Sequence, residues 1–182
     1  MTNKNLFMGS RILLTAFEEQ DAEILAAFSE DTDYLRNLDT DFALPHSSAF
    51  FKADMEATLQ NKNILDFAVR LHDRTLLGFI ALHSIEWTNR RATLAIGIGD
   101  KANRCKGYGS EAIQLILDYA FNELNLNRVG LDVISNNETA IQCYKKNGFT
   151  LEGTAREAVI RNGQKLNLIY MGILEDEWRA KN

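Results

Sequence analysis

The apolar residues between positions 110 and 124 recur every three or four residues. This spacing predicts a helix with one buried stripe. Ser110 is suited to cap this helix, and Glu111 favours its first turn because a helix N-terminus carries a partial positive charge. The stripe consists of Ala112, Ile113, Ile116, Leu117, Ala120, Phe121 and Leu124.

Helical and strand patterns follow one another along the rest of the chain, without a repeat or a low-complexity segment. Helical patterns cover 18–30, 48–60 and a short segment, 136–148, that Gly148 ends. The acidic stretch between the first two reads as irregular. Asn162 and Gly163 predict a tight hairpin turn between the last two strands. The predicted strands cover 10–17, 64–71, 75–87, 92–99, 128–135, 149–160 and 165–174.

The order of these elements predicts the fold class. The front half reads as antiparallel strands and the back half as a β-α-β-α-β unit, so we expect a mixed α/β (α+β) sheet with helices on both faces. The chain has 182 residues, of which 46% are hydrophobic. That length and composition suit a single domain over 1–182.

Charge and composition argue against several classes of function. A formal net charge of -5 does not favour an extended nucleic-acid surface. The two cysteines are far apart and the three histidines do not cluster, so neither a disulfide framework nor a metal site is expected. The N-terminus lacks the apolar run of a signal peptide and no segment is apolar enough to span a membrane, which predicts a cytoplasmic protein.

The sequence "NRCKGYG" directly before the 110–124 helix indicates an anion site. Its two glycines allow close approach of a ligand, Arg104 and Lys106 add positive charge, and the helix N-terminus offers unpaired N–H groups. Phosphate is the favoured ligand, although "GxxxxGK[ST]" and "GxGxxG" are both absent. The alternative is a glycine turn that only leads into a core helix.

A second set of candidate residues lies in "NNETAIQCYKKNGF". Asn137 and Tyr144 are seven residues apart and therefore share one helical face. If the β-α-β crossover is ordinary, the strands before the two helices are neighbours and both helix starts flank one cleft. The alternative is a capping asparagine and a half-buried tyrosine without a chemical role.

Together the two segments resemble a known family. "RCKGYG" resembles the R/Q-x-x-G-x-G/A loop of the GNAT acetyl-CoA-dependent N-acetyltransferases, and the second segment resembles their N-x-x-A-x-x-x-Y-x-x-x-G-F motif. The end, "LEGTAREAVIRNGQKLNLIYMGIL", is similar to the RimJ/RimL-like branch, which includes ribosomal-protein and spermidine acetyltransferases. The resemblance implies a GNAT-like, mostly antiparallel central sheet, acetyl-CoA as co-substrate and a homodimer or higher homo-oligomer.

The resemblance also assigns roles to single residues. Tyr144 would be the general acid for the departing thiolate. A backbone N–H near Ile98 would stabilise the oxyanion, and Asn137 would bond the pantetheine arm. The coenzyme would be held further by Gly97, Ile98 and Gly99 of the strand and by Arg104, Cys105, Lys106, Gly107, Tyr108, Gly109 and Ser110 of the loop.

The general base is the least well matched part of this resemblance. Thr93 and Val159 stand where relatives carry a glutamate. Glu86, near the end of the preceding strand, is therefore the candidate base and would act through a water molecule. The alternative is that Glu86 is only a solvated charge. The amine would then bind already deprotonated, or a water relay would pass its proton to a backbone carbonyl.

The acceptor amine should contact the front half, where an acidic run would attract a cation. A protein N-terminus, a polyamine or another small amine such as an aminoglycoside would fit, and a merely solvated loop explains the run as well. A non-catalytic acyl-CoA-binding sensor and an enzyme for another phosphate ligand are the competing functions. The acidic run contains Glu30, Asp31, Asp33, Asp39 and Asp41.

Overall fold

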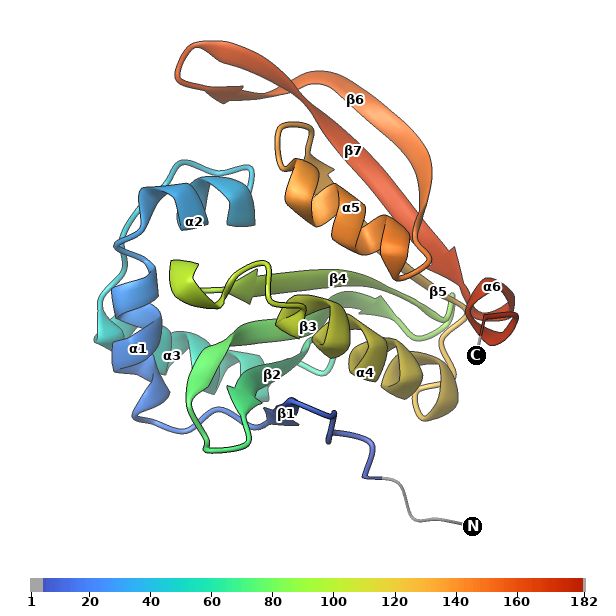
Figure 1. Ribbon diagram of the computed structural model, residues 1–182, viewed down its shortest axis with the longest axis horizontal. Helices are drawn as coiled ribbons and strands as arrows, with labels where there is room; N and C mark the ends of the chain where they lie inside the picture. The colour runs from blue at the N-terminus through green and yellow to red at the C-terminus, as the bar shows by residue number, and fades with distance from the viewer. Residues whose placement is uncertain (1–4, 182) are drawn as a thin grey trace.

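The computed structural model describes residues 5–181 (Figure 1). Residues 1–4 and 182, which the expected domain 1–182 includes, lie outside this description. The strands are β1 (Ile12–Thr15), β2 (Leu65–Leu71), β3 (Leu76–Glu86), β4 (Arg91–Ile98), β5 (Arg128–Ile134), β6 (Thr150–Arg161) and β7 (Gln164–Leu174). They form a seven-stranded sheet in the order β1-β2-β3-β4-β5-β7-β6, and every neighbouring pair except β4 and β5 is antiparallel. The predicted mixed, mostly antiparallel sheet is confirmed.

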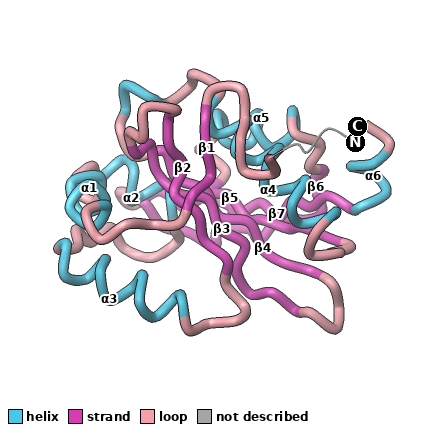
Figure 2. Tube along the Cα trace, turned by 90° about the horizontal axis from the view of Figure 1, so that it is seen from below, coloured by secondary structure: helices cyan, strands magenta, loops and turns pink. Residues whose placement is uncertain are grey.

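Helices cover both faces of this sheet (Figure 2). They are α1 (Asp21–Phe28), α2 (Thr32–Leu38), α3 (Ser48–Leu59), α4 (Tyr108–Asn122), α5 (Glu138–Lys146) and α6 (Glu175–Arg179). Successive strand residues point to opposite faces. The larger core lies where Ile80 and Leu82 of β3 pack with Ile116 of α4. On the other face, Ala68 of β2 packs with Leu25 of α1.

The parallel pair at the centre of the sheet separates soon after it begins. β4 and β5 pair only over Arg91–Thr93 with Arg128–Gly130. Beyond this point no described residue of β5 pairs with β4, so one edge of β4 lacks a strand partner up to Ile98. The helices that follow these two strands, α4 and α5, therefore begin on either side of an opening in the sheet (Figure 1).

The acidic stretch 31–48, which the sequence pattern treats as irregular, contains α2. Asp31 caps this helix by accepting hydrogen bonds from the backbone N–H groups of Asp33 and Tyr34, at 2.9 and 3.3 Å. Because most of the seven helical residues are polar, no hydrophobic stripe marked them. α6 was not expected either.

The start of α4 also differs from expectation. The helix begins at Tyr108, and its N-cap is Gly107, whose φ of +86° lies in the left-handed region that glycine tolerates best. Ser110 therefore lies inside the first turn, and its expected capping role is wrong. Its hydroxyl instead exchanges hydrogen bonds with the side-chain amide of Asn147, at 2.9 and 3.2 Å. This contact ties the start of α4 to the end of α5.

The hairpin of β6 and β7 turns at Asn162 and Gly163, as predicted, with φ of +50° and +75°. It extends past α5 towards α2 (Figure 1). Near its tip, Arg161 donates hydrogen bonds to the backbone carbonyls of Asp39 and Asp41, at 2.8 and 2.9 Å. The hairpin thus holds the loop that follows α2.

A buried ion pair fixes α1 to the sheet. Arg70 of β2 pairs with Asp21 at the start of α1, and the two side chains are 4% and 1% exposed. Asp21 also accepts a hydrogen bond from the backbone N–H of Glu18 at 2.7 Å, and Arg70 donates to the Thr15 hydroxyl at 2.9 Å. Since α1 leads directly into α2, this pair sets the position of the acidic segment.

Asp21→Ala should lower the free energy of unfolding by about 3 kcal/mol or more, because Arg70 would keep its buried charge without a partner. Chemical denaturation measures this change. Glu19→Ala is the matched control, since it removes the exposed ion pair with Lys52 and should leave the unfolding midpoint unchanged. Equal effects of the two substitutions would contradict the anchoring role of Asp21.

Candidate active site

The N-terminus of α4 presents unpaired backbone donors. The first bond of the helical ladder runs from the N–H of Glu111 to the carbonyl of Gly107, at 3.1 Å. No side chain caps the helix, and within the described residues the N–H groups of Tyr108, Gly109 and Ser110 have no hydrogen-bond acceptor. Three such donors at the positive end of a 15-residue helix form a strong anion site.

Arg11, from just before β1, orients the loop in front of these donors. Its guanidinium donates to the carbonyls of Lys106 and Gly107, at 2.7 and 3.2 Å. Because C=O and N–H point in opposite directions in a trans peptide, the N–H groups of Gly107 and Tyr108 face away from Arg11. The arginine therefore aims loop donors at the site without occupying it.

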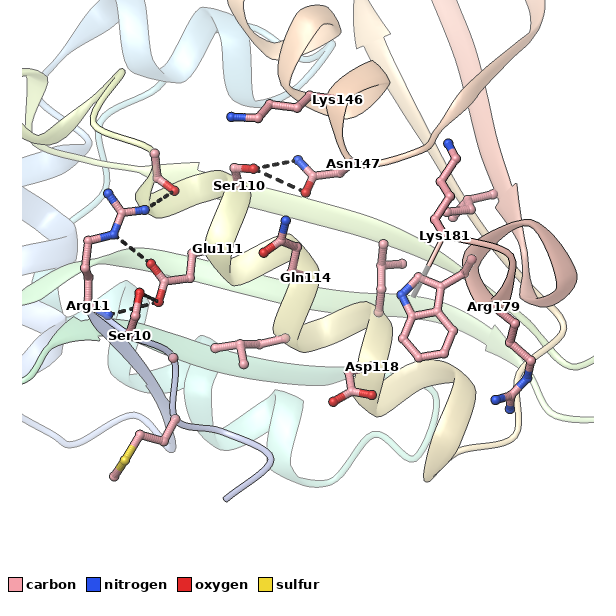
Figure 3. A pocket seen from close by; sticks show the side chains of 17 residues that line it. Ser10, Arg11, Ser110, Glu111, Gln114, Asp118, Lys146, Asn147, Arg179 and Lys181 are labelled. Atoms are coloured by element: carbon pink, nitrogen blue, oxygen red, sulfur yellow. Dashed lines mark hydrogen bonds and ion pairs between the residues drawn. The ribbon is translucent and has the colours of Figure 1, made fainter. Parts of the chain in front are cut away.

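Glu111 in turn holds Arg11 in place (Figure 3). Its carboxylate accepts hydrogen bonds from the Nε and the backbone N–H of Arg11, both at 2.9 Å, and from the Ser10 hydroxyl at 3.0 Å. Burial would raise the pKa of Glu111, but these bonds outweigh it and lower the pKa below its ordinary value. Glu111 therefore stays ionised and keeps Arg11 against the loop.

Arg104 does not lie free for a phosphate, contrary to expectation. Its guanidinium binds the carboxylate of Asp31 at 2.8 Å and the backbone carbonyls of Ile98, at 3.0 Å, and Gly99. It also lies over the Tyr34 ring, 5.5 Å from the ring centroid. Arg104 thus ties the loop to the end of β4 and to α2, and its charge is already compensated.

Cys105 and Lys106 are exposed, and Cys105 has a φ of +59°. Tyr108, Gly109 and Ser110 are half-buried, and Tyr108 packs against the core.

Close packing explains why glycine occupies positions 97 and 99, at the end of β4 and just after it. An added Cβ at Gly97 would lie 2.5 Å from the Tyr34 hydroxyl, and one at Gly99 would strike the ring of Phe28.

A cleft runs from the loop into the opening between β4 and β5. Its outer part, about 590 Å³, is lined by loop residues including Arg104, Gly107 and Gly109. Its inner part, about 380 Å³, contains Tyr144. The two parts share the lining residues Asn37, Leu38, Ile96, Ile98, Gly109, Asn137, Ala140 and Cys143, so the cleft is continuous.

The structure brings Asn137 and Tyr144 together in this cleft, as their spacing predicts. Asn137 caps α5 by accepting from the backbone N–H of Ala140 at 3.2 Å. Tyr144 is 9% exposed, and its ring lies edge-on to that of Phe149. Burial, with a smaller contribution from the neighbouring Cys143 and from Asp132, raises the pKa of Tyr144. The hydroxyl therefore carries its proton throughout the physiological range.

Three polar residues share the inner cleft with Tyr144, namely Asp132 of β5, His83 of β3 and Asp39 after α2. Asp39 belongs to the acidic run expected to attract the acceptor, whereas sequence reasoning missed Asp132 and His83. Burial raises the pKa of Asp132, and the charge of Asp39 adds to this, while His83 opposes it. The available signal for Asp132 was an acidic residue between Leu131 and Val133 in the middle of the predicted strand "RVGLDVIS".

Glu86, the expected base, lies elsewhere. It is at the far end of β3, where its carboxylate pairs with Arg91 and accepts from the Asn89 side chain at 2.6 Å. These two bonds lower the pKa of Glu86 below its ordinary value. Glu86 is not among the residues that line either part of the cleft.

A larger groove, about 1070 Å³, lies on the other side of the α4 N-terminus (Figure 3). It shares Gly107, Ser110 and Lys146 with the outer cleft. Lys146 lies near Ser110 and Asn147, whereas Lys181 lies at the other end of the groove, on the side of Arg179 (Figure 3). The start of α4 is therefore open on two sides, towards the cleft and towards this groove.

Within residues 5–181, none of the helices has the length and apolar character needed to cross a membrane. No group of three or more metal-ligating side chains comes together among these residues.

Comparison with known proteins identifies the family. A family model described as an acetyltransferase (GNAT) domain matches residues 11–150. The chain therefore belongs to the GNAT acetyltransferase family, and its relatives agree with the RimJ/RimL-like branch indicated by its sequence. It is an acetyl-CoA-dependent N-acetyltransferase.

Individual relatives support this assignment. Spermidine N(1)-acetyltransferase of Escherichia coli (strain K12) is 30% identical over 164 residues, which cover 84% of this chain and 86% of that protein. The putative ribosomal N-acetyltransferase YdaF of Bacillus subtilis (strain 168) is 35% identical over 111 residues, 61% of this chain and 60% of that protein. The fold matches spermidine N-acetyltransferase from Vibrio cholerae in complex with CoA and spermine, with a TM-score of 0.85 at 24% identity, over 94% of this chain and 99% of that one.

Gly107→Ala should weaken coenzyme A binding at least about tenfold. The new Cβ would lie 3.0 Å from the Arg11 guanidinium and would disturb the charge-assisted hydrogen bonds from Arg11 to the loop carbonyls. Gly163→Ala is the matched control: its φ is also positive and nothing lies within 4 Å of its added Cβ. Both variants should lose about 1 kcal/mol of stability. Calorimetric titration that found equal coenzyme affinity in the two variants would refute the loop assignment.

Proposed function

We propose that the protein transfers an acetyl group from acetyl-CoA to a primary amine by direct attack, with a polyamine or a protein N-terminus as acceptor. The observation that carries this proposal is the continuous cleft, which leads from the anion site at α4 to the buried Tyr144 hydroxyl. A thioester on a long phosphorylated arm fits such a path. We also propose that residues 1–182 form one domain.

The cleft suggests how coenzyme A lies. Its pyrophosphate would accept from the N–H groups at the start of α4, which Arg11 and Glu111 keep in position. The pantetheine arm would pair with the free edge of β4 at Gly97, Ile98 and Gly99 and pass Asn137. The nucleotide end would enter the groove beyond α4, where Lys146 and Lys181 supply positive charge.

The proton balance of the reaction limits what Tyr144 can do. An alkylammonium, with a pKa near about 10.4, must lose a proton before it attacks, and a thiolate with a conjugate acid near about 8.5 departs. Because the pKa of Tyr144 is raised, complete proton transfer from its hydroxyl to the thiolate is unfavourable. We assign Tyr144 a hydrogen bond that stabilises the sulfur as it departs as a thiolate, while the hydroxyl keeps its proton.

We assign the base role to Asp132 in place of Glu86. Asp132 lines the inner cleft with Tyr144, and its raised pKa brings it closer to that of the amine. Direct proton transfer from the ammonium to the carboxylate is still uphill. Asp132 therefore acts through a water molecule and accepts the protons that the amine releases during the reaction. Asp39 and His83 stand beside it and would attract and orient the incoming amine.

The acceptor class rests on charge and on the relatives. Two residues of the acidic segment line the cleft, Asp33 in its outer part and Asp39 in its inner part. Asp33 pairs with Lys101, so the charge of Asp39 is the one that favours a cationic acceptor. The relatives named above include a spermidine acetyltransferase and a putative ribosomal acetyltransferase, which supports a polyamine or a protein N-terminus.

The cysteine content and an exposed edge strand bear on where the protein is located and how it assembles. We place the protein in the cytoplasm, as its cysteine usage suggests. We also propose a homodimer or higher homo-oligomer, because β6 is an edge strand on which Leu151 and Ile160 are 61% and 65% exposed.

Free-thiol release from acetyl-CoA tests this function across a panel of amines. The panel contains spermidine, an aminoglycoside, and peptides with N-terminal Ser, Ala or Met. Turnover should appear with spermidine or with one of the peptides. Turnover with the aminoglycoside alone would correct the acceptor class. Coenzyme binding without turnover on any amine would contradict catalysis and favour the acyl-CoA sensor.

Tyr144→Phe should lower kcat about 100-fold, because the departing sulfur would lose its donor, while the dissociation constant of coenzyme A should not change. Tyr119→Phe is the control, since Tyr119 packs against Phe7 and Phe67 and does not line the cleft. Steady-state kinetics and calorimetry separate the two effects. An unchanged kcat in Tyr144→Phe would remove Tyr144 from the reaction.

A further inference from the structure

A third cavity, about 480 Å³, lies next to the inner cleft on the α1 and α3 side of the sheet. Most of its wall is apolar and includes Leu38, Met55 and Phe79. It shares Leu38 and Asp39 with the inner cleft, so the two spaces adjoin. Nothing in the proposed handling of acetyl-CoA uses this cavity.

Among residues 5–181, two carboxylates that line this cavity have no positive partner. Asp66 of β2 is half-buried, and Asp54 of α3, which is exposed, stands near it. No lysine or arginine of residues 5–181 forms an ion pair with either of them. Burial, with the neighbouring charge of Asp54, raises the pKa of Asp66. A bound cation would relieve this uncompensated pair.

The sheet provides a short path from Asp66 to the reaction centre. Asp66 pairs with Ala81 of β3, and Ala81 pairs with Ala95 of β4, so the three side chains share one face. Ala81 lines the third cavity and Ala95 lines the inner cleft. The two alanines leave room above the sheet, and Asp66 is about 10 Å from Ala95 across two strand spacings.

We propose that this cavity binds the distal end of the acceptor, and that the preferred acceptor is a long-chain diamine or polyamine. This inference rests on the proposed acetyl transfer. One amine reacts beside Tyr144 and Asp132. The alkyl chain crosses Ala95 and Ala81 along the apolar wall, and the second ammonium pairs with Asp66 and Asp54. Octane-1,8-diamine is long enough for this span and butane-1,4-diamine is too short.

The test compares kcat/KM for octane-1,8-diamine, octylamine and butane-1,4-diamine. Wild-type protein should favour octane-1,8-diamine over octylamine at least about tenfold, as expected for a partly buried charge pair. Asp66→Asn, which leaves Asp54 in place, should reduce that ratio at least about threefold and should leave octylamine unchanged. The lower limit of the ratio is about two, because the diamine has two equivalent ends. Glu56→Gln removes a neighbouring charge of α3 that does not line the cavity and should keep the wild-type ratio.

The outcomes separate the two proposals. A wild-type ratio near two, or an unchanged ratio in Asp66→Asn, overturns the subsite while octylamine turnover still supports acetyl transfer. If no amine is acetylated, the proposed function fails, and calorimetric titration of octane-1,8-diamine then tests the subsite. Tighter binding to wild-type protein than to Asp66→Asn supports the subsite, and equal binding overturns it.

Ala81→Val narrows the path and should lower kcat/KM for octylamine more than for butane-1,4-diamine. The reverse order counts against the path.

Discussion

The separation of β4 from β5 after three residue pairs is the constraint on which the rest of the structure depends. A parallel pair that continued would close the sheet and satisfy its backbone groups. Here the edge of β4 beyond Thr93 lacks a strand partner, and buried backbone groups need one. A ligand with amides along its length, such as the pantetheine arm, can supply that partner. The same separation sets the starts of α4 and α5 on opposite sides of the cleft.

Two arginines fix the backbone in front of the proposed anion site at the start of α4. Arg11 binds two loop carbonyls, and Arg104 binds two carbonyls at the end of β4. Arginine suits this task because its planar group carries several donors and stays charged. Since Glu111 and Asp31 compensate the two charges, the attraction for phosphate comes from oriented peptide N–H groups and the helix end. Such donors are already in place before the ligand arrives.

Features set by local sequence could be predicted. The stripe of α4 and the Asn162–Gly163 turn each depend on residues a few positions apart, and both agree with the structure, except that α4 ends at Asn122, before Leu124. The start of α4 could not be placed by the expected capping serine, Ser110, because Gly107 already turns the chain three residues earlier. α2 was missed because its capping aspartate precedes a mostly polar helix.

The composition of the site depended on contacts between distant residues. Arg11 is 95 residues from Lys106, and His83, Asp39 and Asp132 meet only when β3, β5 and the loop after α2 come together. No spacing rule links such positions. Conversely, Glu86 was chosen for its place at a strand end, and the tight turn after it brings Arg91 back to pair with it.

The most direct test of the anion site compares 4′-phosphopantetheine with pantetheine by calorimetric titration. The two ligands share the arm and differ by one phosphate, so their affinity ratio reports what the α4 N-terminus contributes. We predict that 4′-phosphopantetheine binds at least about tenfold more tightly than pantetheine, and that this affinity ratio is smaller in Gly107→Ala. Equal affinities would contradict the claim that the loop and helix start form a phosphate site.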